Sequence, residues 1–154
     1  MNPSLLIYAD VCCLNRPLDD LQQARIRLEA EAMLTILQKC EDGEWALVNS
    51  DAIRFKILKN TNPEKREQLQ AILSLATREV KFTRSIEAQA QHFMKLGLKL
   101  YDALHLASAH AASVDVFLTT DDRLLKAVKR NPESIFILVE NPVTWLMQQL
   151  QQED

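Results

Sequence analysis

The chain has 154 residues, of which 47% are hydrophobic and 25% charged, enough for one globular domain with its own core. A formal net charge of −3 gives no global positive field that would attract nucleic acid, so any such binding depends on a local patch. The apolar stretches are shorter than the roughly 20 residues of a membrane span, and the N-terminal one lacks the basic segment of a signal peptide. We therefore expect a single domain over residues 1–154, without membrane contact.

Cysteine and histidine offer no site for a soft metal. The three cysteines, Cys12, Cys13 and Cys40, form neither a disulfide framework nor a C-x-x-C pair, and they suggest a reduced, cytoplasmic setting. His105 and His110 do not have the i, i+4 spacing of a helical zinc site. We therefore do not expect zinc chemistry.

Glycine content excludes several enzyme classes. Only Gly43 and Gly97 are present, so the chain contains neither a G-x-G-x-x-G turn nor a phosphate-binding P-loop. The G-x-S-x-G sequence of many serine hydrolases is also missing. Dinucleotide-dependent enzymes, P-loop NTPases and serine hydrolases are thus poor candidates.

Strand and helix patterns alternate along the chain. Short apolar runs predict strands at Leu5–Ala9, Trp45–Asn49, Val116–Thr120 and Ile135–Val139, with a weaker fifth at Glu79–Phe82. Helical spacing predicts helices at Asp19–Lys39, Ser85–Leu96 and Leu100–Ala112, two segments separated at Asn60–Pro63, and a last helix from Asn141 and Pro142. Strands that are apolar at nearly every position are typical of parallel sheets covered on both faces. The expected fold class is α/β, with a mainly parallel sheet of four or five strands flanked by helices.

Acidic residues follow two of these strands. Asp10 ends the first strand, and Asp121 and Asp122 follow the "VFLTT" strand, where one capping side chain would be enough. If the two strands are neighbours, Asp10 and Asp121 meet at the carboxyl edge of the sheet, where α/β folds bind ligands. Asp102, in the first turn of a helix, is a third candidate. Each of these residues could instead cap a helix or complement its dipole.

A cluster of carboxylates points to a hard cation. Several acids in one crevice repel one another, and a fold tolerates this mainly when a cation neutralises them. Oxygen ligands without cysteine or histidine favour Mg²⁺ or Mn²⁺, and a metal with open positions can activate water for attack on a phosphoryl group. Phosphodiester hydrolysis is therefore the expected reaction.

The ordered segments "IYADVCCLNRP", "LVNSDAIRFKI", "KLYDALHLASAH", "FLTTDDRLL" and "ILVENPVTWL" resemble the PIN-domain family over essentially the whole chain. Domains of this size look most like the VapC toxin ribonucleases of bacterial toxin–antitoxin pairs. The resemblance implies a PIN-like fold and metal-dependent cleavage of single-stranded RNA. It also implies a homodimer restrained by an antitoxin protein.

The resemblance assigns roles to individual residues. Asp10, Asp102 and Asp121 match the family's metal-site aspartates, and are expected to be catalytic. Asp122 matches a frequent additional acid, and Ser50 matches the serine that usually ends the second strand.

The chain departs from the family at one position, where Lys56 replaces the usual glutamate of "S-x-x-x-x-x-E". Two interpretations stay open: Lys56 neutralises the carboxylates and weakens metal binding, or its flexible stem carries the charge into solvent. Asp51 is no simple replacement, because it lies roughly 140° around the helix from Lys56. Glu29 or Glu31 could supply the missing acid.

Other candidates have ordinary alternatives. Arg16 could pair with substrate phosphate or be solvated, and His105 could contact RNA, orient Asp102 or pack between helices. A possible basic rim consists of Lys95, Lys99, Arg123, Lys126, Lys129 and Arg130, although such runs are usually solvated faces.

Two other functions compete with a ribonuclease. Lys56 motivates a PIN-like module that binds RNA or protein without cutting. A phosphoacceptor receiver domain with Asp51 as acceptor fits less well, because it leaves Asp102 and the "TTDD" pair unexplained.

Overall fold

The computed structural model describes residues 3–152. Its strands are β1 (Leu5–Ala9), β2 (Trp45–Ser50), β3 (Arg78–Val80), β4 (Val116–Leu118) and β5 (Val139–Glu140). Its helices are α1 (Val11–Asn15), the 3-10 turn η1 (Arg16–Leu18), α2 (Ala24–Glu41), α3 (Asp51–Leu58), α4 (Pro63–Leu73), α5 (Arg84–Lys95), α6 (Leu100–Ala111), α7 (Asp122–Lys129) and α8 (Pro142–Gln152). The predicted α/β class is confirmed.

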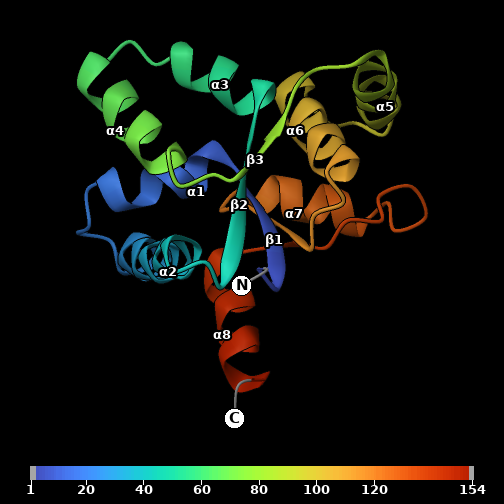
Figure 1. Ribbon diagram of the computed structural model, residues 1–154. Coiled ribbons are helices and arrows are strands. Elements are labelled where there is room, and N and C mark those ends of the chain that lie inside the picture. The colour runs from blue at the N-terminus through green and yellow to red at the C-terminus, as the bar shows by residue number, and fades with distance from the viewer. Residues whose placement is uncertain (1–2, 153–154) are drawn as a thin grey trace.

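The five strands form one parallel sheet in the order β3-β2-β1-β4-β5. Figure 1 shows this sheet nearly edge-on, with α1 to α4 on one side, α5 to α7 on the other and α8 below. Because both faces are covered, the central strands are apolar at nearly every residue, as the sequence predicted. Ile7, Leu47 and Phe117 from the three central strands are fully buried.

Strand order decides where the site forms. β1 lies between β2 and β4, with Ile7 in register with both Leu47 and Val116. The residues that follow these three strands therefore lie at the same edge of the sheet. Each strand continues almost directly into a helix, capped by Asp10, Ser50 and Asp121.

The fourth predicted strand is mostly wrong. Of residues Ile135–Val139, only Val139 belongs to β5. Ile135 is buried outside any strand, whereas Phe136 and Leu138 are 76% and 48% exposed. An edge position next to the short β4 leaves most of this apolar run without a pairing partner.

Candidate functional site at the carboxyl edge of the sheet

Asp10 and Asp121 are linked through the hydroxyl group of Thr119. Thr119 Oγ1 donates a hydrogen bond to Asp10 Oδ2 at 3.1 Å and accepts one from the backbone N–H of Asp121, also at 3.1 Å. The Asp10 backbone N–H donates to the carbonyl of Leu118, at the end of β4. Thr119 is fully buried and Asp10 is 3% exposed. The two aspartates that the sequence places after separate strands are thus held together.

Asp10 and Asp121 also cap helices. Asp10 Oδ1 accepts from the N–H of Val11 at 2.8 Å, and Asp121 Oδ1 accepts from the N–H of Arg123 at 2.9 Å. Capping fixes the direction of both carboxylates without consuming every lone pair, because a carboxylate has about four acceptor sites. The capping and functional interpretations are therefore compatible.

Asp102 belongs to the same electrostatic environment. It lies in the first turn of α6 and is partly buried. Burial raises the pKa of its carboxyl, and the negative charges of Asp10 and Asp121 raise it further, while Lys56 and Lys99 lower it. The charges of Asp10 and Asp121 thus act on Asp102, as the sequence argument expects for a crevice of like charges.

The donor chemistry of this crevice fits a hard cation, since its ligands would be carboxylate oxygens. Within residues 3–152, however, no group of three histidine, cysteine, aspartate or glutamate side chains is already arranged to hold a metal ion. The chemical nature of the donors therefore supports the predicted metal, whereas a closed ligand cage is not preformed.

Lys56 lies close enough to act on the site. Its side chain is partly buried on α3, and its charge lowers the pKa of both Asp102 and His105. It lines a cavity of about 400 Å³ together with Cys12, Lys59 and Tyr101. The described residues that line this cavity include no carboxylate, so the effect of Lys56 on Asp102 is that of a nearby charge and not of an ion pair.

A buried polar chain extends from Ser50 to the site. Tyr8 Oη lies 2.7 Å from Ser50 Oγ and 2.7 Å from His105 Nδ1. On the far side of the imidazole, Nε2 lies 3.9 Å from Asp10 Oδ1. Ser50 and Tyr8 are fully buried, as is His105. The serine and histidine that the sequence singled out are therefore joined by a tyrosine that it did not.

Donor and acceptor capacity favours one direction for this chain. The Ile53 N–H donates to Ser50 Oγ, which leaves the serine proton for Tyr8 and the tyrosine proton for His105 Nδ1. His105 Nε2 then carries its hydrogen toward Asp10. If the chain ran the other way, the lone pair of Nε2 would face the Asp10 carboxylate, and the two would repel each other.

Burial also keeps His105 neutral. Desolvation has the largest effect, and the pKa of the imidazole is lowered to about 4. Asp10 raises the pKa by less than desolvation lowers it, and Lys56 lowers it slightly further. Nε2 has no hydrogen-bond partner among the described residues. The neutral imidazole thus lies beside Asp10, at 3.9 Å from Oδ1, without forming a hydrogen bond to that carboxylate or neutralising it.

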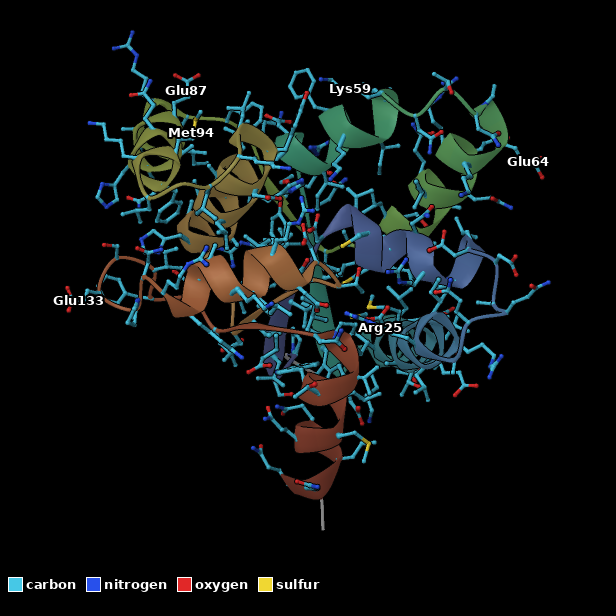
Figure 2. All side chains as sticks on the ribbon, turned by 180° about the vertical axis from the view of Figure 1, so that it is seen from behind. Arg25, Lys59, Glu64, Glu87, Met94 and Glu133 are labelled. Atoms are coloured by element: carbon cyan, nitrogen blue, oxygen red, sulfur yellow. The ribbon has the colours of Figure 1, made fainter. Side chains whose placement is uncertain are left out.

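Glu29 is held in a different network. It is 1% exposed and accepts from Arg16 Nε at 2.8 Å, Arg25 Nε at 3.2 Å and Asn141 Nδ2 at 2.7 Å. These contacts join η1, α2 and the start of α8, and Figure 2 shows Arg25 near the junction of α2 and α8. With its carboxylate used in this way, Glu29 has a structural role.

Of three other predicted site residues, two are bound to different partners and one is exposed. Arg16 also binds Asp19 at 2.7 Å, so its guanidinium is occupied within the protein. Asp122 is 57% exposed and accepts two hydrogen bonds from Arg25, which lowers the pKa of its carboxyl. Glu31 is exposed on α2. The structure thus does not group these side chains with Asp10, Asp102 and Asp121.

The residues missed from the sequence are Tyr8 and Thr119. Each lies inside an apolar strand run or directly after one, where a polar atom looks like an exception in a core segment. Two signals could have identified them: a buried hydroxyl group needs a hydrogen-bond partner, and each residue stands two positions before a candidate aspartate.

Comparison with known proteins agrees with this architecture. A sequence model of the PIN domain matches residues 44–131. No curated protein matches the chain. Among solved structures, VapBC2 from Rickettsia felis, bound to a DNA fragment from their promoter, is similar with a TM-score of 0.57 and 13% identity, over 89% of this chain and 98% of that one. The chain belongs to the PIN domain family.

Proposed function

We propose that the protein is a divalent-metal-dependent endoribonuclease that cleaves single-stranded RNA, with Asp10, Asp102 and Asp121 as its catalytic acids. The observation that carries the proposal is the Thr119 hydroxyl, which holds Asp10 and Asp121 together while their charges raise the pKa of Asp102. PIN domains are generally nucleases, so the family and the clustered carboxylates support the same reaction class.

Asp10, Asp102 and Asp121 would hold the cation, either Mg²⁺ or Mn²⁺. When bound, the ion would supply a Lewis acid for the phosphoryl oxygen and lower the pKa of a bound water. His105 would keep a neutral imidazole beside Asp10, and Thr119 would fix the spacing between Asp10 and Asp121. Lys56 would reduce the net negative charge and so the affinity for the ion.

The test is cleavage of a panel of single-stranded RNAs by purified protein with Mg²⁺, Mn²⁺ or EDTA. We expect divalent-dependent cleavage that Asp10→Asn abolishes. Glu64→Gln is the matched control, because Glu64 is an exposed carboxylate at the outer end of α4, as Figure 2 shows. Equal cleavage by the wild type and Asp10→Asn would exclude this site.

A second function is a PIN-like module that binds RNA or protein with little or no cleavage. The electrostatic effect of Lys56 on Asp102 favours it, since a built-in cation opposes metal binding. RNA binding with no cleavage under any divalent condition, restored to cleavage by Lys56→Glu, would identify this alternative.

The proposed biological role is the toxin of a toxin–antitoxin pair, with an antitoxin protein as partner and a homodimer as the working form. The resemblance to VapC ribonucleases supports this role, together with the similarity of the fold to VapBC2. The apolar residues at the end of α4 do not offer a contact between subunits, because Leu73 is buried and Ile72 and Leu75 pack against the core. Exposed Phe55 and Leu58 on α3 are better candidates for contact between subunits. Light scattering at micromolar concentration tests the dimer.

No helix within the described residues is long and apolar enough to cross a membrane. The cytoplasmic location stays a prediction from cysteine usage.

A further inference from the structure

A cavity of about 310 Å³ adjoins the carboxylate crevice on the α7 side. Asp102 and Asp121 form its acidic part, and Lys99, Arg123 and Arg130 form its basic part. Its remaining lining residues are Gly97, Leu98, Leu124 and Ala127. Carboxylates and cations thus share one hollow, with apolar side chains between them.

The three cations of this cavity are available to a ligand. Lys99, Arg123 and Arg130 are exposed, and within residues 3–152 none of them forms an ion pair. By contrast, Arg16, Arg25 and Arg54 are each bound to carboxylates. The charge of Lys99 does reach the site, since it lowers the pKa of Asp102. Unpaired guanidinium groups beside a candidate reaction centre are suited to phosphate oxygens.

Their spacing along α7 fits an extended ligand. Arg123 and Arg130 are seven residues apart, which places them on the same helix face about 10 Å apart along the axis. Leu124 and Ala127 lie between them on the cavity wall. This arrangement offers cationic contacts at two ends of the cavity, which suits the repeated phosphate groups of a nucleotide backbone.

Two other cavities provide a comparison. The cavity of about 590 Å³ between α2, α7 and α8 contains Arg25, but that residue is neutralised by Glu29 and Asp122. The cavity of Lys56 and Tyr101 meets the same N-terminal end of α6, and there the ammonium of Lys59 lies over the Tyr101 ring, 4.4 Å from its centroid. Among these three, only the cavity beside Asp102 combines candidate catalytic acids with several unpaired cations.

We propose that this cavity binds a phosphodiester group of single-stranded RNA next to the scissile bond. Lys99, Arg123 and Arg130 hold the backbone, and Asp102 and Asp121 face the reacting phosphate. The inference rests on the proposed ribonuclease function and assigns the side of the crevice along which the substrate lies.

The test separates binding from cleavage. A fluorescent single-stranded RNA is titrated with protein in EDTA, in an Asp10→Asn background, over a range of salt concentrations. Lys99→Gln, Arg123→Gln and Arg130→Gln should each weaken binding about 3- to 10-fold, and each should reduce the slope of log affinity against log salt by about 0.7. Arg84→Gln is the control, because Arg84 is an exposed cation at the start of the separate helix α5.

The cleavage arm uses the same substitutions in the wild-type background. The three cavity variants should raise KM several-fold and leave kcat within about twofold, since they act on uniform binding of the backbone. If no protein cleaves RNA but the affinity and salt slopes change as expected, the binding site stands and the nuclease proposal fails. If RNA is cleaved but slopes and KM of all three variants equal those of Arg84→Gln, the inference is wrong.

Discussion

The phenol oxygen of Tyr8 lies 2.7 Å from Nδ1 of His105, on the side of the imidazole opposite Asp10. Because both side chains are fully buried, no solvent competes for this hydrogen bond. The proton that Tyr8 donates determines which nitrogen of His105 carries a hydrogen. A residue of β1 thereby controls what the neighbouring Asp10 carboxylate faces.

Tyr8→Phe should disrupt this control and destabilise the fold. It removes the donor to His105 Nδ1 and the partner of Ser50 Oγ, so the free energy of unfolding should fall by about 1–3 kcal/mol. Nitrogen-15 NMR of the imidazole should show the Nε2–H tautomer in the wild type and a mixture in Tyr8→Phe. His92 and His110 are exposed and provide reference signals. A wild-type Nδ1–H tautomer would contradict the assigned direction.

Thr119→Val should reduce RNA cleavage by the folded protein. The substitution keeps the shape of the side chain but removes the hydroxyl that donates to Asp10 and accepts from the Asp121 N–H. We expect a 10- to 100-fold loss of kcat/KM, measured on the folded protein with a cleavable RNA, because small displacements of catalytic groups cost about this much. Thr119→Ser retains the hydroxyl and is the matched control. Wild-type kcat/KM in Thr119→Val, or a loss in Thr119→Ser as large as in Thr119→Val, would mean that the hydrogen bonds of the hydroxyl do not determine the activity.

Stability should depend on pH through His105. Its pKa is about 4 in the folded protein and about 6.5 when unfolded, so the unfolded state binds more protons between these values. Stability from this group is complete above pH 6.5 and is lost as the pH falls toward 4, by up to about 3 kcal/mol. The raised pKa of Asp102 makes stability depend on pH in the opposite direction. This contribution is present in both the wild type and His105→Gln, so it cancels when the two are compared. Urea unfolding at several pH values gives the free energy of unfolding as a function of pH. Between pH 4 and 6.5 this free energy should change less with pH in His105→Gln than in the wild type. The same pH dependence in both proteins would refute a buried neutral imidazole.

Glu29→Gln should lower the stability of the fold without changing the affinity for Mn²⁺. Its carboxylate joins Arg16, Arg25 and Asn141, and its loss should cost about 2 kcal/mol. This is less than for a fully buried pair, because the two arginines are 22% and 53% exposed. Calorimetric Mn²⁺ titration should give the wild-type affinity. A clear loss of Mn²⁺ affinity in folded Glu29→Gln would instead make Glu29 the missing fourth acid.

The fold was largely predictable because its strands are buried on both faces. Leu5–Ala9 was predicted with the observed bounds, since its apolar run ends abruptly at Asp10. The predicted strand at Ile135–Val139 shows the limit of this signal. An apolar run predicts burial, but a strand also needs a neighbouring strand of similar length for pairing. Because β4 ends at Leu118, on the side away from β1 it pairs only with Val139 and Glu140.

The parts of the site that strand order positions were predictable from the sequence. The side chains whose direction is set by long-range ion pairs were not. Asp10 and Asp121 meet because β1 and β4 are neighbours, as the sequence argument required. Asp122 is adjacent in sequence to Asp121, yet one residue along a helix turns its carboxylate toward Arg25 on α2. Such long-range ion pairs leave no pattern in a single sequence.

Lys56 gives the sharpest prediction, because its charge acts on Asp102 at the position where the family has glutamate. Wild-type protein should bind Mn²⁺ weakly, and Lys56→Glu should bind it at least tenfold more tightly, a change of about 1.4 kcal/mol. Lys56→Gln should lie between them, since it removes one charge without adding another. Calorimetry measures the affinities, RNA cleavage is followed in parallel, and Arg84→Glu controls for net charge. If Lys56→Glu and Arg84→Glu show the same small increase, Lys56 acts only through the overall field, and the three aspartates form the site without it.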